Sequence, residues 1–120
     1  MADEICNARI TEVSFGYEDH GFLTFFLGLD IAGGGGCCWG GYCLDEYDKA
    51  QGRRIPTQAG FECLTEIMKT VGVDNWEDLE GKYIRVVSRG IGRTIKTIGN
   101  LMEDKWFDIE EFFKAKRNRT

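Results

Sequence analysis

Apolar and polar residues alternate over three stretches in the first half of the chain. Residues 5–15 alternate until the apolar register slips near Thr11, which predicts a strand with a β-bulge at that point. Residues 22–31 predict a second strand, with one face made of Leu23, Phe25, Leu27, Leu29 and Ile31. The other face has Thr24, Gly28 and Asp30, together with Phe22 and Phe26. Residues 37–44 alternate between small and large side chains and predict a third strand, followed by a polar connection.

The apolar period then changes from that of a strand to that of a helix. Residues 58–71 predict one helix, with Thr57 as its N-cap and Gly72 as the left-handed residue that ends it. We expect this helix to pack on the strands and to bury its apolar residues Phe61, Leu64, Ile67 and Met68.

Four shorter elements complete the pattern. Residues 75–79 predict a helical turn, and residues 82–89 and 93–101 predict a fourth and a fifth strand. Asp108 begins a capping-box pattern and predicts a terminal helix with a basic tail over residues 109–120.

The order of these elements fits a single domain of 120 residues, with a core over residues 4–108. Three strands, a helix and two more strands match the connectivity of an OB-fold. We therefore predict a mainly β (α+β) chain: a small five-stranded antiparallel OB-like barrel or curved sheet with one packed helix and a C-terminal helix. An open antiparallel sheet packed on one helix has the same element order and is the alternative.

Charge is distributed unevenly along the chain, whose net charge is −5. Residues 1–50 hold nine acidic and two basic residues, whereas residues 82–100 hold five basic residues and no acidic one. This balance disfavours binding to duplex DNA but allows a local site for a compact anion. No apolar run is long enough to cross a bilayer, and the first residues do not resemble a signal peptide, so we expect a cytosolic protein without a membrane partner.

The five cysteines are expected to be reduced thiols. A zinc site made of Cys37, Cys38 and Cys43 would need a distant fourth ligand, so we expect neither a metal nor any other cofactor. No Ser-His-Asp or Cys-His arrangement is readable around His20, which is the only histidine, and we expect no catalysis.

Three features suggest a ligand site. In the glycine run 33–36, Gly35 and Gly36 could form a nest of N–H groups for an anion, although the run matches no dinucleotide or Walker A motif. Arg89 and Arg93 flank a predicted tight turn, with Arg85 and Lys96 nearby, and in an OB-fold this turn would face the loop that contains His20. Trp39 and Tyr42 fall on opposite faces of the third strand, so one of them points outward and could stack on a base.

Several blocks of the sequence resemble a family of small uncharacterised proteins encoded by tailed bacteriophages and prophages. The resemblance spans residues 5–108 and is carried by residues 7–10 (NARI), 18–24 (EDHGFLT), 39–45 (WGGYCLD), 72–82 (GVDNWEDLEGK), 98–100 (IGN) and 106–107 (WF). It implies a phage accessory protein that acts in the cytoplasm of the bacterial host. Where family members have a Gly-Phe-Gly-Gly-Tyr-like segment, this chain has a Cys37-Cys38 pair before Trp39, which argues against an essential cysteine.

These observations lead to three hypotheses about function. The first is an anti-defence protein that binds and sequesters a small nucleotide-derived immune signal without catalysis, through Arg85, Arg89, Arg93, Lys96, Gly35, Gly36, Trp39, Tyr42 and His20. The second is an OB-type single-stranded nucleic-acid-binding protein, and the third is a protein-binding inhibitor of a host defence enzyme. We also expect self-association, with the aromatic residues Trp106, Phe112 and Phe113 near the interface.

Overall fold

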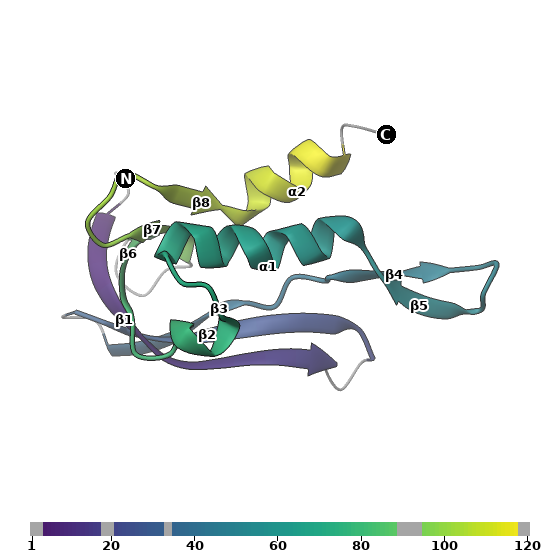
Figure 1. The fold of residues 1–120 in the computed structure, drawn as a ribbon, viewed down its shortest axis with the longest axis horizontal. Helices are drawn as coiled ribbons and strands as arrows, with labels where there is room; N and C mark the ends of the chain where they lie inside the picture. Colours follow the sequence, from purple (N-terminus) through teal and green to yellow (C-terminus); the bar gives the residue numbers. More distant parts are fainter. Residues whose placement is uncertain (1–3, 18–20, 33–34, 89–94, 118–120) are drawn as a thin grey trace.

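The computed structural model describes residues 4–17, 21–32, 35–88 and 95–117 (Figure 1). Its elements in chain order are β1 (Glu4–Tyr17), β2 (Leu23–Ile31), β3 (Gly35–Gly40), β4 (Asp45–Asp48), β5 (Arg53–Pro56), α1 (Gln58–Val71), the 3-10 helix η1 (Trp76–Leu79), β6 (Tyr83–Ser88), β7 (Ile95–Asn100), β8 (Trp106–Asp108) and α2 (Ile109–Arg117). Six strands form one antiparallel sheet in the order β3-β2-β1-β6-β7-β8, and β4 and β5 form a separate hairpin.

The predicted α+β class, with a packed helix and a C-terminal helix, is confirmed, but the five-stranded barrel is wrong. An OB-type barrel needs its third strand to close against the last strands. Here β3 lies at one end of the sheet, and β7 and β8 lie at the other. The sheet is therefore open, and both helices lie on one side of it (Figure 1).

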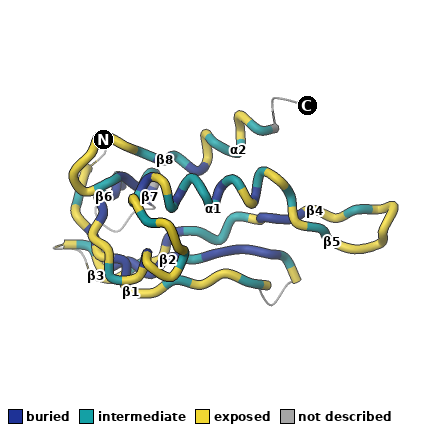
Figure 2. Tube along the Cα trace, in the orientation of Figure 1, coloured by how far each residue is buried: buried dark blue, intermediate teal, exposed yellow. Residues whose placement is uncertain are grey.

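Side-chain alternation divides the sheet into a covered face and an open face. Cross-strand partners share a face, so the buried Ala8 and Ile10 of β1 lie on the helix side with Ile84 and Val86 of β6. The predicted bulge in β1 is confirmed, because the register with β2 shifts between Ile10 and Glu12. The dark blue segments in Figure 2 show the core that this helix-side face builds with α1.

Helix α1 has the predicted bounds and caps. The Thr57 hydroxyl accepts a hydrogen bond from the Gly60 N–H at 2.9 Å, and Gly72 ends the helix in the left-handed region at φ 94°. The predicted buried face is correct only for Ile67, because Leu64 and Met68 are half-buried and Phe61 is 70% exposed. The inward face runs instead through Gly60, Cys63, Ile67 and Thr70.

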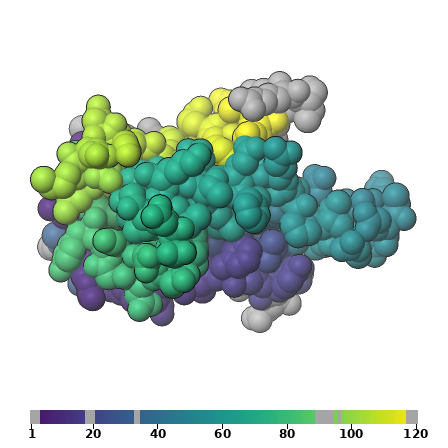
Figure 3. Space-filling model, viewed as in Figure 1, coloured from purple at the N-terminus to yellow at the C-terminus, as the bar shows by residue number. Residues whose placement is uncertain are grey.

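The third strand ends earlier than predicted, and the polar connection after it is a hairpin. Gly40 and Gly41 have φ values of 130° and 84°, which turn the chain out of the extended conformation. At Gly40 any Cβ would lie 2.5 Å from the Phe25 carbonyl oxygen. The β4–β5 hairpin that follows projects from one end of the molecule (Figure 3).

A buried carboxylate holds the base of this hairpin. Asp45 Oδ1 accepts hydrogen bonds from Arg54 Nε at 3.1 Å and Nη2 at 2.9 Å, and Oδ2 accepts one from the Leu23 N–H at 3.0 Å. Burial opposes ionisation of Asp45. The hydrogen bonds from Arg54, Cys43 and Leu23 outweigh it and hold the pKa of this carboxyl below its usual 3.8.

We predict that Asp45→Asn lowers the free energy of unfolding at neutral pH by about 1–2 kcal/mol, since charge-assisted hydrogen bonds to a partly exposed Arg54 are lost. A lowered native pKa stabilises the fold above the unfolded pKa of about 4, and this contribution disappears as pH falls through the native pKa. The difference between wild type and Asp45→Asn should therefore shrink in urea titrations between about pH 6 and about pH 3. Glu46→Gln is the matched control, because Glu46 is exposed on the same hairpin. A gap that stays constant with pH would contradict this role of Asp45.

Candidate ligand-binding face of the sheet

The structure describes only part of the predicted site. His20, Arg89 and Arg93 lie outside the described residues. Gly35 and Gly36 begin β3 and are exposed, and Lys96 lies within β7. Arg85 lies in β6, on the face of the sheet opposite the helices, because its neighbours Ile84 and Val86 are fully buried on the helix side.

Trp39 is the member of the Trp39–Tyr42 pair that points into the core. Its side chain is 3% exposed and makes edge contacts with Phe25 and Phe107, at centroid distances of 5.5 Å and 6.4 Å. Its indole Nε1 has no hydrogen-bond partner among the described residues. Trp39 is therefore a core residue and cannot stack on a ligand base without unfolding this region.

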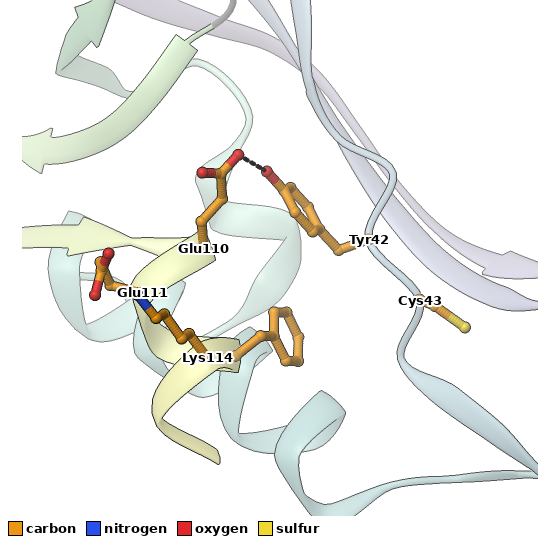
Figure 4. A pocket seen from close by; sticks show the side chains of 6 residues that line it. Tyr42, Cys43, Glu110, Glu111 and Lys114 are labelled. Atoms are coloured by element: carbon orange, nitrogen blue, oxygen red, sulfur yellow. Dashed lines mark hydrogen bonds between the residues drawn. The ribbon is translucent and has the colours of Figure 1, made fainter. Parts of the chain in front are cut away.

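Tyr42 is half-buried and lines a surface pocket of about 490 Å³ with Cys43, Glu110, Glu111, Phe113 and Lys114. Its ring lies nearly parallel to that of Phe113, with the ring centroids 6.1 Å apart. Its hydroxyl donates to Glu110 Oε1 at 3.5 Å (Figure 4). Burial raises the pKa of the Tyr42 hydroxyl, and Glu110 raises it further. Two carboxylates against one lysine make this pocket unsuited to a phosphate.

Arg85 is held firmly in place on the open face. Its Nε donates to the Asn100 carbonyl oxygen at 2.7 Å, and its Nη2 donates to the Glu103 carbonyl oxygen at 2.7 Å. The guanidinium carbon lies 4.3 Å from the centroid of the Trp106 ring. Gly99 makes this arrangement possible, because a Cβ there would lie 2.3 Å from the Trp106 ring.

The exposed Tyr83 lies next to Arg85 on the same face. Tyr83 is 58% exposed, precedes Arg85 by two residues in β6 and pairs directly with the exposed Arg9 of β1. On its other side Arg9 pairs with Asp30 of β2. We call Arg9, Tyr83, Arg85 and Trp106 the arginine–tyrosine face. The exposed Tyr83 ring can stack on a base while the neighbouring arginines bind phosphate.

The sequence analysis identified Arg85 but missed Tyr83 and Arg9. The signal was present in the alternation of β6, where Ile84 and Val86 point inward and leave Tyr83 and Arg85 outward. Arg9 could be added only with the β1–β6 register, which joins residues far apart in the sequence.

The cysteines do not form a common site in the described part of the chain. No group of three or more His, Cys, Asp or Glu side chains able to hold a metal ion occurs among the described residues. All five cysteines are free, and burial raises the pKa of Cys63 to about 12, with Glu66 adding to the shift. Cys63 is therefore a protonated core residue at neutral pH.

Several residues of the sequence segments 39–45 and 98–100 have structural roles. Gly40 and Gly41 end β3, Asp45 holds the hairpin, and Gly99 accommodates Trp106. The side chain of Asn100 donates to the carbonyl oxygens at the end of α1.

No helix among the described residues is long and apolar enough to cross a membrane. Comparisons with protein-family models, with curated proteins and with solved structures gave no match to this chain.

Proposed function

We propose that this protein is a non-catalytic binding protein that holds a small nucleotide-derived ligand on its arginine–tyrosine face. The observation that carries the proposal is the exposed Tyr83, with Arg9 as its cross-strand partner and Arg85 two residues along β6, on the sheet face opposite both helices (Figure 1). A base would stack on Tyr83, and the phosphates would receive charge-assisted hydrogen bonds from the arginines.

The fixed position of the Arg85 guanidinium supports this proposal. Its hydrogen bonds to two carbonyl oxygens and its contact with Trp106 fix the guanidinium before any ligand arrives. A guanidinium that is already ordered loses little conformational entropy on binding, which favours affinity for a compact anion. Arg89, Arg93 and Lys96 belong to the same acid-free run of the sequence as Arg85.

The charge of the chain favours a small ligand. A chain with a net charge of −5 repels a long polyanion, but a patch of a few arginines attracts a compact one. The biological role we propose, sequestration of a bacterial immune signal by a phage accessory protein in the host cytoplasm, rests on the family resemblance. Binding without turnover is supported by the lack of a readable nucleophile–base arrangement around the single histidine.

Single-stranded nucleic acid is the alternative ligand, because an open antiparallel sheet face with aromatic residues is also a typical platform for unpaired bases. The two candidates differ in salt dependence. Binding of an oligonucleotide releases several counterions and weakens steeply with salt, whereas binding of a dinucleotide-sized ligand weakens less.

We predict that Tyr83→Ala weakens ligand binding by about 5- to 100-fold, because one stacked base is lost. Arg9→Ala should weaken it by about 10- to 100-fold through the loss of a charge-assisted bond. The measurement is calorimetry against cyclic dinucleotides, cyclic trinucleotides and cyclic ADP-ribose isomers. Tyr47→Ala is the matched control, because Tyr47 is 57% exposed on the distant β4–β5 hairpin.

Two outcomes would contradict the proposal. One is equal loss of affinity in Tyr83→Ala and Tyr47→Ala. The other is no binding of any nucleotide together with tight binding of a single-stranded oligonucleotide or of a host protein, which would favour one of the alternative classes.

A further inference from the structure

We propose that the outer edge of β3 is a self-association edge, where β3 of a second copy of this chain pairs antiparallel and joins two sheets into one. In the described part of the chain, β3 is hydrogen-bonded only to β2 and forms one end of the six-stranded sheet. Its other edge therefore presents backbone N–H and carbonyl groups that a further strand can satisfy.

The features that normally protect an edge strand from pairing are missing from β3. Its six residues, Gly35–Gly40, include no charged residue and no proline, and its register with β2 is continuous. Charged side chains, proline and bulges are the usual means of preventing edge-to-edge association. An edge without them is available for pairing over residues 36–39, between Gly35 and Gly40, whose positive φ values depart from the extended conformation.

Other unpaired strand edges in the described part of the chain are protected. Strands β4 and β5 of the hairpin carry charged residues, and β5 ends in Pro56. Strand β8 at the opposite end of the sheet has only three residues, and it is preceded by Asp104 and Lys105. Strand β1 leaves β6 after Arg9, and the stretch that follows contains a bulge and Glu12. The contrast makes β3 the edge best suited to strand addition.

Charge identifies a second copy as the partner. Two copies that each carry a net charge of −5 repel one another over most of their surfaces. Residues 31–44 are an uninterrupted stretch without a charged residue, and β3 lies within it. Identical neutral strands can therefore meet about a two-fold axis without bringing like charges together.

The geometry of this pairing also determines how the two copies are arranged. An antiparallel pair of identical edge strands has its two-fold axis perpendicular to the sheet. Both open faces, each with its own Tyr83, would then lie on the same side of a continuous sheet, and the helices of both copies would lie on the other. Trp106, Phe112 and Phe113 would not be at the interface, in contrast to the expectation from sequence.

Light scattering of the full chain under reducing conditions in the micromolar range tests the proposal. We expect a dimer for the wild type and a monomer for Cys38→Lys, because Cys38 is exposed on β3 and lysine is the residue that most often protects an edge. Ile5→Lys is the control, since Ile5 is 62% exposed on the open face of β1 and should leave the dimer intact. A monomeric wild type, or a dimer that survives Cys38→Lys and is lost in Ile5→Lys, would overturn the proposal.

Disulfide cross-linking of the wild type gives a second test that does not depend on how a variant folds. Diamide takes two electrons and two protons from a pair of thiols and becomes the hydrazine, leaving a disulfide. Cross-strand partners share a face, so we expect the major intermolecular product to join Cys38 to Cys38 or Cys37 to Cys37 of the two copies, as identified by peptide mass spectrometry. Cross-links through the exposed Cys43 alone would count against β3 pairing.

Discussion

Replacing Gly60 with alanine is expected to lower the free energy of unfolding by about 3 kcal/mol. Gly60 lies in the first turn of α1, where a Cβ would be 2.3 Å from the Leu44 carbonyl oxygen and 2.8 Å from the Leu44 Cα. These are backbone atoms, so no side-chain rotation relieves the clash. In an ordinary helix the same change stabilises by up to about 1 kcal/mol, so the predicted sign is reversed.

The surroundings of Gly60 explain why the backbone of Leu44 cannot move away. Its carbonyl oxygen accepts hydrogen bonds from the Thr57 N–H at 3.0 Å and from the Thr57 hydroxyl at 3.1 Å, and its N–H donates to the Leu23 carbonyl oxygen at 2.8 Å. The start of α1, the start of β2 and the base of the hairpin therefore meet at Leu44. A shift of this residue would break all three connections.

Chemical denaturation of Gly60→Ala and Gly36→Ala measures this effect. Gly36 is the matched control, because a Cβ there meets nothing closer than the Leu29 carbonyl oxygen at 3.7 Å and its backbone needs no positive φ. Gly36→Ala should change the free energy of unfolding by less than about 1 kcal/mol. Equal stability of the two variants would show that α1 can move away from Leu44.

Local sequence signals predicted those parts of the fold that depend on local chemistry. The slip of apolar register at Thr11 marks the bulge, because one extra residue changes which side chains face the core. Thr57 and Gly72 mark the ends of α1, because an N-cap hydroxyl and a left-handed glycine act within a few residues.

The features that the sequence did not predict depend on distant partners. Phe61 fits the helical period, but Gly60 must face Leu44, and this rotates the buried stripe away from Phe61. The short strand β8 becomes a strand only because Phe107 pairs with Ile98 of β7. Closure into a barrel likewise depends on where β3 lies relative to β7, which no local pattern specifies.

In the candidate site, too, local sequence signals place some residues, and others depend on pairing with a distant strand. The alternation in β6 was sufficient to place Arg85 outward, and the pairing with β1 was needed to bring Arg9 beside Tyr83. The alternation rule also predicted that only one of Trp39 and Tyr42 is a core residue. It could not predict where Tyr42 lies, because Gly40 and Gly41 interrupt the strand between them.

The side chain of Asn100, the last residue of β7, connects the end of α1 to the turn between β7 and β8. Its Nδ2 donates to the carbonyl oxygens of Thr70 at 3.0 Å and Val71 at 3.1 Å, at the end of α1. Its Oδ1 accepts from the N–H groups of Met102 and Glu103, each at 2.9 Å. The amide therefore satisfies helix carbonyls that lack partners within the helix and also shapes the turn between β7 and β8.

We predict that Asn100→Ala lowers the free energy of unfolding by about 2–4 kcal/mol, because four hydrogen bonds are lost and the helix carbonyls are left partly buried without a donor. Asn100→Asp tests which half of the amide matters. A carboxylate can still accept from Met102 and Glu103 but cannot donate to Thr70 and Val71. We therefore expect a loss of stability at neutral pH that is partly recovered when the carboxyl is protonated in acid.

Asn75→Ala is the control, since the side chain of the exposed Asn75 bonds only to Asp78 among the described residues, at 3.3 Å. Urea denaturation measures the stabilities, and hydrogen exchange at Gly72 and Val73, whose N–H groups donate to the Met68 carbonyl oxygen, reports on the helix end. Unchanged exchange at these two amides in Asn100→Ala would show that α1 ends in the same way without the Asn100 side chain.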